Sequence, residues 1–237
     1  MSRSNPNENG TPNPSRRWFD WNGEVGSVRY YDKDAKQNVE VGSDFTFLLL
    51  DQLGSVRGWH DASESGIYSN EVKDTRQEPM IVKAFKGGTL AEGIYKDIKD
   101  RVNAVGGQFV ANCYSAFKHS DELAIGSIRF KGVALSAWMD FGKTHRADLY
   151  KKAIRIRGFT EGKKGRIVFR VPVFTVADLS EETHQIATGL DVELQAFLAS
   201  YLKRTTRDQV DRTAVEQPDH ELPGDDAPPM TDDDIGF

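Results

Sequence analysis

Cationic and aromatic residues alternate over short stretches in the middle of the chain, as where Lys83 and Lys86 flank Phe85. Cations can pair with the phosphates of a nucleic-acid strand, and aromatic faces can stack on unpaired bases at about 1–3 kcal/mol per base. The pattern therefore predicts sequence-independent binding of a single strand. The candidate strand-binding residues are Lys83, Phe85, Lys86, Tyr114, Phe117, Lys118, Arg129, Lys131, Trp138, Lys143, Arg155, Arg157, Lys163, Lys164 and Arg166.

Each of these residues also has a purely structural interpretation, because an aromatic residue in a strand belongs to a core more often than to a binding surface. We assign Phe130, Phe169 and Phe174 to the core. The better candidates for stacking are Tyr30, Tyr31, Trp59, Phe85, Tyr114 and Trp138. Arg155 and Arg157 share one face of a predicted strand, and across a short hairpin Arg166 and Arg170 are expected beside them.

The C-terminal segment from Thr213 to Phe237 contains eight acidic residues and no Lys or Arg. Such a peptide offers too little apolar surface to fold by itself. A terminal Phe can fill an apolar slot on a partner while carboxylates meet Lys and Arg around that slot. A solubilising acidic tail is the alternative interpretation, although solubility does not require a terminal aromatic residue. The segment ends with Asp232, Asp233, Asp234, Ile235, Gly236 and Phe237.

This tip resembles that of bacterial single-stranded-DNA-binding proteins, whose tails end in D-D-D-I-P-F. The chain departs from the pattern at Gly236, where the family usually has Pro, and it matches at Asp232, Asp233, Asp234, Ile235 and Phe237. In length and layout it is similar to phage-encoded single-stranded-DNA-binding proteins, which pair one oligonucleotide-binding (OB) domain with an acidic tail ending in Phe. The resemblance implies a role in DNA replication, recombination and repair, with replication or recombination proteins bound by the tip.

Strands are expected to carry most of the candidate residues, because short aromatic and β-branched runs alternate with Gly, Asp and Asn. The predicted strands are 17–22, 26–31, 45–51, 54–59, 80–86, 107–117, 124–131, 133–140, 152–159 and 166–174. Apolar stripes predict helices from about Leu90 to Val105 and from Ser180 to Lys203. The class is thus mainly β with two helices (α+β). The favoured architecture is the OB fold, a Greek-key β-barrel with a middle helix, here with added strands and a C-terminal helix. Another small barrel or sandwich fits the pattern too.

Composition divides the chain into three parts. Residues 1–15 are polar and rich in Pro and Asn, which predicts disorder. Residues 16–204 form the predicted binding domain, and 205–237 the predicted disordered acidic tail. The net charge is −5, of which 213–237 contribute −8, so that the rest carries 31 basic and 28 acidic residues, or +3. We expect the acidic tail to occupy a basic groove in part until DNA displaces it.

Several classes of chemistry find little support. Cys113 is the only cysteine, which excludes an internal disulfide and a Cys-based zinc site, and the five histidines lack ligand-like spacing. Residues 137–144 satisfy a permissive P-loop pattern, but bulky Trp, Met and Phe fill the loop and βαβ repeats are missing. We therefore expect no catalytic residue, metal or cofactor. Without a signal peptide or an apolar run of membrane length, the prediction is a soluble, intracellular protein. The resemblance implies that its location is the cytoplasm of a bacterial host.

Three other functions stay open at this point. One is a recombination annealing or adaptor protein that uses the same tip, and another is an enzyme, either a nuclease or a P-loop ATPase, with an acidic tail. The third is a protein unrelated to DNA whose tail only improves solubility. The sequence also leaves open a homodimer, the size of the binding site and the preference for DNA over RNA.

Overall fold

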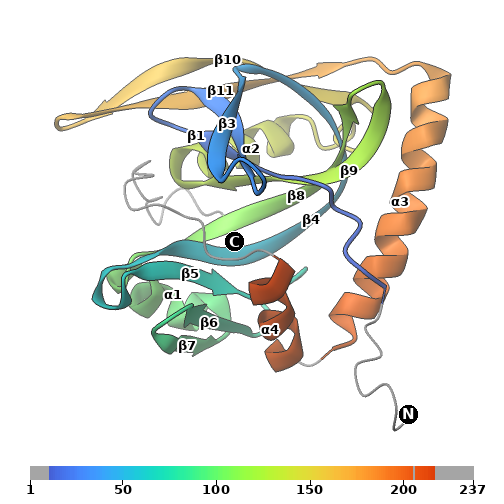
Figure 1. Cartoon of the computed structure of the whole chain (residues 1–237). Coiled ribbons are helices and arrows are strands. Elements are labelled where there is room, and N and C mark those ends of the chain that lie inside the picture. Colours follow the sequence, from blue (N-terminus) through green and yellow to red (C-terminus); the bar gives the residue numbers. More distant parts are fainter. Residues whose placement is uncertain (1–10, 205, 217–237) are drawn as a thin grey trace, which may run out of the picture.

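The computed structural model describes residues 11–204 and 206–216, and its strands belong to one mixed sheet that does not close (Figure 1). The strands are β1 Trp18–Asn22, β2 Ser27–Asp32, β3 Gln37–Gly42, β4 Asp44–His60, β5 Ser65–Ser69, β6 Met80–Ala84, β7 Gly88–Gly93, β8 Gly107–His119, β9 Glu122–Lys131, β10 Ala153–Lys164 and β11 Ile167–Ala177. The helices are the short 3-10 turn η1 Asp61–Ser63 and the α-helices α1 Tyr95–Ala104, α2 Gly132–Thr144, α3 Glu181–Leu202 and α4 Thr206–Glu216.

The order of the strands places distant segments side by side. The main path runs β3-β2-β1-β9-β8-β4-β5-β6-β7, and β10 joins the first part of β4 while β11 pairs with β10. β1 and β9 are parallel, and the other strand pairs are antiparallel. The prediction of a mainly β chain of the α+β class is confirmed. The sheet of the described residues is open, so the predicted closed barrel is not what the structure shows.

α2 lies inside the curve of the sheet, between β8 and the β10–β11 pair (Figure 1). Trp138 is 2% exposed and packs against Phe130 and Phe174, with ring centroids 5.2 and 5.3 Å away. Its indole N–H donates to Gln52 Oε1 at 2.8 Å, which satisfies the one polar atom of the buried ring. α2 thereby fills the larger apolar core of the molecule.

The prediction of a strand over 133–140 was wrong, because this segment forms α2. Gly132 takes φ +53°, a left-handed conformation that ends β9 and turns the chain. The buried residues that follow are Ala134, Leu135, Trp138 and Phe141, whose spacing matches one face of a helix. This segment has two aromatic residues within a short apolar run, and such runs suit a strand and a buried helix equally.

Other boundaries also differ from the prediction. The predicted strands 45–51 and 54–59 form the single strand β4, which bulges beside Asp51 and then continues. The predicted helix from Leu90 begins only at Tyr95, since residues 88–93 pair with β6 as the edge strand β7. The predicted helix 180–203 is confirmed as α3, where the Ser180 side chain accepts from the Thr183 N–H at 3.2 Å.

α1 and α2 cover one face of the sheet, and α3 and α4 cover the other. α3 packs Leu194, Phe197 and Tyr201 against residues of β4, β8 and β9. α4 lies within the segment that the sequence assigned to the disordered tail, so that prediction was wrong for residues 206–216. Its Val210 is buried against Tyr68 and Ile81, which supply the apolar surface that the isolated peptide lacks. Residues 217–237, which include the predicted tip, lie outside the described residues.

Candidate functional site

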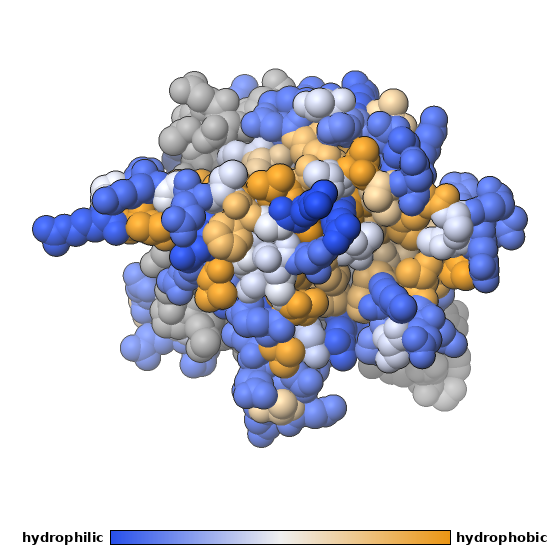
Figure 2. All heavy atoms as spheres, turned by 90° about the horizontal axis from the view of Figure 1, so that it is seen from above, coloured by the Kyte–Doolittle hydropathy of each residue, from blue (hydrophilic) through white to orange (hydrophobic). Residues whose placement is uncertain are grey.

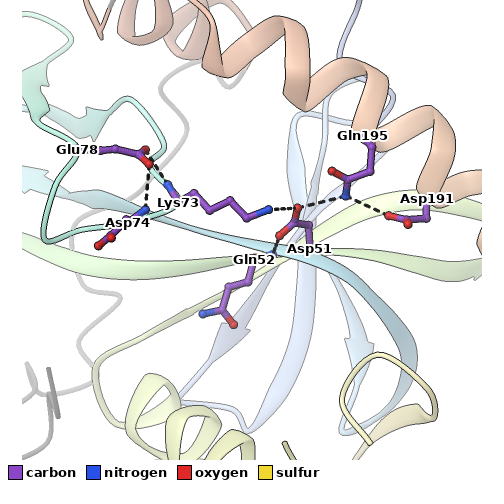
Figure 3. A network of polar contacts seen from close by, with 7 residues as sticks. All are labelled: Asp51, Gln52, Lys73, Asp74, Glu78, Asp191 and Gln195. Carbon is purple, nitrogen blue, oxygen red and sulfur yellow. Dashed lines mark hydrogen bonds and ion pairs between the residues drawn. The ribbon is translucent and has the colours of Figure 1, made fainter. Parts of the chain in front are cut away.

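A buried carboxylate, Asp51, lies directly after the bulge of β4 and is a first candidate for chemistry (Figure 3). Asp51 Oδ2 accepts from Lys73 Nζ at 2.9 Å and from Gln195 Nε2 at 3.2 Å, and Oδ1 accepts from the Gln52 N–H at 2.8 Å. These contacts hold α3 and the loop after β5 against β4, and they use both oxygens. Among the described residues no group of three His, Cys, Asp or Glu could hold a metal ion. We therefore interpret this network as structural.

A hairpin formed by β10 and β11 projects beyond the rest of the sheet (Figure 1). β10 pairs with β4 only as far as Arg157, and beyond it β10 and β11 pair with each other up to Lys164 and Ile167. We call residues 157–172 the arm. Its turn is made at Gly165, where φ is +61°. The arm therefore presents both of its faces over much of its length.

The arm is strongly basic. It contains five cations and a single carboxylate, Glu161, which gives a net charge of +4. Glu161 pairs with Arg170 at 3.1 Å. No ion pair joins the other four cations to any residue within the described ranges, and all four side chains are exposed: Arg157, Lys163, Lys164 and Arg166. Such a cluster on a projecting hairpin suits a polyanion.

Apolar side chains accompany these cations on the arm. Phe169 pairs with Gly162, and its ring lies so close that a methyl group at Gly162 would come within 2.3 Å of it. Ile167 and Val168 are 49% and 48% exposed. Figure 2 looks down on this side of the molecule and shows orange hydrophobic atoms behind the blue tip of the projecting arm. The half-exposed ring of Phe169, on the same face as Lys164 and Ile167, is available for stacking.

The base of the arm is fixed to the turn between β1 and β2. The Arg170 N–H donates to the Gly23 carbonyl at 2.8 Å, and the Trp21 indole N–H donates to the Arg170 carbonyl at 2.8 Å. The Phe159 ring lies over Gly26, where a Cβ would come within 2.5 Å, and the Arg170 guanidinium lies 5.4 Å from that ring. These contacts hold the base of the arm in one orientation while its tip projects.

Five of the predicted strand-binding residues come together on β10 and the turn that follows: Arg155, Arg157, Lys163, Lys164 and Arg166. Arg155 lies outside the arm, and its guanidinium donates two hydrogen bonds to the Asp44 carboxylate, one of them at 2.7 Å. This contact lowers the pKa of Asp44 and raises that of Arg155. The exposed positive charge is therefore concentrated farther out along the hairpin.

Three aromatic residues of the predicted strand-binding set are in the core, so the prediction was wrong for Tyr114, Phe117 and Trp138. Each is at most 3% exposed, which leaves no ring face for a base. The Tyr114 hydroxyl donates to Glu71 Oε2 at 2.6 Å, and the Phe117 ring packs 4.8 Å from that of Phe19. β8 is covered on both faces, so aromatic residues at alternate positions are buried whichever way they point.

The remaining predicted cations and Phe85 lie apart from the arm. Lys83 pairs with Asp211 of α4 at 2.6 Å, and Phe85 packs on Tyr68 with centroids 4.3 Å apart. Lys143 pairs with Asp140 at 3.2 Å. Lys86 and Lys118 are exposed at the ends of β6 and β8, and Arg129 and Lys131 lie on β9. The structure thus divides the predicted set among several surfaces.

Sequence reasoning missed two aromatic residues of the arm. Phe169 was assigned to the core and is instead half-exposed on the arm, whereas Phe130 is buried and Phe174 packs against the core as predicted. Phe159, which is 38% exposed, was not considered. The signal that could have placed Phe169 is the glycine at position 162, because a hairpin turn at Gly165 sets these two residues opposite each other.

Arg129 is buried and forms two hydrogen bonds with Asp20, Nε to Oδ1 at 2.7 Å and Nη2 to Oδ2 at 2.6 Å. Burial by itself would raise the pKa of Asp20, but the Arg129 guanidinium, assisted by Lys131 and Arg29, brings it below its ordinary value. The stabilisation is therefore complete above about pH 4, the ordinary pKa of an aspartate, and is lost as the pH falls through the lower folded-state pKa.

We expect Asp20→Asn to lower the free energy of unfolding at pH 7 by about 3 kcal/mol, because Arg129 loses its carboxylate while it stays buried. Urea unfolding between pH 2 and pH 7 measures this change. The difference between variant and wild type should shrink as the pH falls below about 4. A difference that stays constant over the whole range would contradict the assigned ion pair.

No family model, curated protein or solved structure matches this chain. Within residues 11–204 and 206–216, no helix is long and apolar enough to cross a membrane.

Proposed function

We propose that this chain binds single-stranded DNA without sequence preference and that the arm is a principal contact with the strand. The observation that carries the proposal is the combination of a net charge of +4 with the half-exposed ring of Phe169 on one projecting hairpin. The exposed cations suit phosphates, and the aromatic face suits unpaired bases. A duplex offers phosphates but keeps its bases stacked, so the aromatic and apolar face favours a single strand.

The acidic tail has the second role in this proposal. It recruits replication or recombination proteins through Asp232, Asp233, Asp234, Ile235 and Phe237, and so acts in DNA replication, recombination and repair. The sequence resemblance of this tip supports the role and also suggests a phage protein acting in the bacterial host cytoplasm.

The OB fold remains part of the proposal as the finer description of the domain. Five neighbouring strands, β10, β4, β8, β9 and β1, curve around the core that α2 fills. The contacts of Trp21 and Gly23 with Arg170 bring the β1 end of this set to β11, the hairpin partner of β10, although no ladder closes the set within the described residues. This arrangement supports a barrel-like domain whose barrel is open.

Fluorescence anisotropy of a labelled 30-nucleotide single strand tests the proposal. We expect saturable binding at low salt that weakens steeply as salt rises, because phosphate contacts release counterions. An unlabelled duplex of the same length should compete less well than the unlabelled single strand. Absence of binding at low salt would contradict the proposed function. Competition by the duplex as strong as that by the unlabelled single strand would contradict it too.

Phe169→Ala is expected to weaken binding of the 30-mer by roughly 5- to 150-fold, the loss of one stacked base at about 1–3 kcal/mol. Phe169→Trp should retain the affinity because it keeps an aromatic face. Val168→Ala is the matched control, since Val168 lies on the other face of the same strand and is more exposed than Phe169. An equal loss in the two alanine variants would argue against stacking on Phe169.

A further inference from the structure

The face of the sheet that α3 and α4 cover continues beyond them onto β9, β1 and β2. Asp20 pairs in register with Arg29 of β2 on one side and with Arg129 of β9 on the other. Lys131 lies two residues after Arg129 and therefore on the same face. Three cations thus surround one carboxylate on three neighbouring strands, over about 10 Å at the usual strand spacing.

Aromatic residues lie next to this cationic cluster. Trp18 precedes Asp20 by two residues and Tyr31 follows Arg29 by two, so both belong to the same face. Both side chains are partly exposed, and Lys33 Nζ lies 5.8 Å from the centre of the Trp18 ring. Trp18 Nε1 is enclosed, yet no hydrogen-bond acceptor within the described ranges reaches it.

The turn between β1 and β2 connects this face to the arm. The same turn carries Gly23, which accepts from the Arg170 N–H, and Glu24, whose carbonyl accepts from the Arg170 guanidinium. The cationic cluster and the base of the arm are therefore held in a fixed relation by one short segment. Trp21 contacts the arm from the face of β1 opposite Asp20, so a strand bound at the base of the arm would cross this turn to reach the face that carries Arg29 and Lys131.

We propose that Trp18, Arg29, Tyr31 and Lys131 form a second contact surface for the same single strand that the arm binds. This inference rests on the proposed function and adds a route for the bound strand, from the arm to the face formed by β9, β1 and β2. The cations of β2 and β9 hold phosphates, while Trp18 and Tyr31 offer ring faces to bases. Glu40, opposite Arg29 on β3, places a second carboxylate beside this surface and accepts from the Ser27 hydroxyl and the Asn22 amide.

The double variant Arg29→Gln with Lys131→Gln tests this surface against the labelled 30-mer. Removing two phosphate contacts should lower the slope of log K against log salt by about 1.4 and weaken binding at 0.1 M salt by roughly 25-fold. The matched control is Lys96→Gln with Arg101→Gln, which removes two exposed cations from α1 on the opposite face of the sheet. Thermal unfolding monitored by circular dichroism shows whether each variant remains folded.

The outcomes separate the two proposals. If the wild type does not bind the 30-mer, the proposed function fails. If the wild type binds and Phe169→Ala weakens it, but the double variant binds like its control, the second surface is wrong.

A cross-linking measurement on the wild type removes any dependence on the folding of the variants. A 30-mer containing 5-iodouracil is irradiated with the full chain, and the cross-linked peptides are identified by mass spectrometry. We expect cross-links at Trp18 or Tyr31 in addition to the arm. Cross-links confined to the arm would overturn the second surface even where the double variant binds weakly.

Discussion

Replacing Lys163, Lys164 and Arg166 with alanine should cause a large loss of affinity for single-stranded DNA. These side chains are exposed around the turn of the arm and carry three of its five cations. Each phosphate contact on a single strand contributes about 0.7 to the slope of log K against log salt. Loss of all three should lower the slope by about 2 and reduce the affinity at 0.1 M salt by roughly 100-fold.

Anisotropy titrations of the 30-mer at several salt concentrations measure both quantities. The control variant carries Lys96→Ala, Arg101→Ala and Lys151→Ala, which remove three exposed cations at positions away from the arm. Both triple variants change the net charge equally, so only the position of the cations differs. If the control loses as much affinity as the arm variant, binding depends on total charge and the arm has no special role.

The hairpin of the arm was predictable in part because the apolar–polar alternation and the turn residues of its sequence both indicate a β-hairpin. Alternation at Ile154, Arg155, Ile156 and Arg157, followed by a Gly-rich turn, predicted a hairpin, and both strands were found. Its projection beyond the sheet could not be foreseen, since it depends on where β4 stops pairing with β10. That ladder joins residues more than a hundred positions apart.

The errors have a common physical origin in tertiary packing. Tyr114 and Trp138 were predicted to stack on bases because the residues next to them in the sequence do not show whether an aromatic side chain is buried or exposed. α3 covers Tyr114 and the curve of the sheet encloses Trp138, and both coverings come from distant segments. The parallel pairing of β1 with β9 also depends on distant segments, because it brings Asp20 next to Arg129, 109 positions away in the sequence. No local pattern specifies such contacts.

Helix α4 extends to Glu216 and so overlaps the start of the acidic segment, which limits where the tail can be cut without damage to the fold. Deletion from Thr213, as the sequence suggested, would cut α4, where the Thr213 hydroxyl donates to the Gln209 carbonyl at 3.0 Å. Residues 217–237 contain seven carboxylates and no Lys or Arg, so a chain ending at Glu216 removes the charge and keeps the helix. This deletion isolates the electrostatic role of the tail from the stability of the domain.

Deletion of 217–237 is expected to tighten binding of the 30-mer about tenfold at low salt. The composition of residues 217–237 predicts a segment without fixed structure. A chain of 21 such residues would have a root-mean-square reach of about 25 Å and a millimolar effective concentration near the domain. Its carboxylates therefore compete with phosphates for the cations of the arm. The gain should disappear at high salt, because screening weakens the tail and the phosphates alike.

Two further variants separate charge from length. Replacing the seven acidic residues of 217–237 with Asn and Gln keeps the length, and it should tighten binding as much as the deletion if charge is the cause. Removing Phe237 alone should leave DNA affinity nearly unchanged, because the seven side-chain carboxylates remain. Unchanged affinity of the deleted chain at low salt would show that the tail does not compete for the strand, and its acidic residues would then act only on partner proteins.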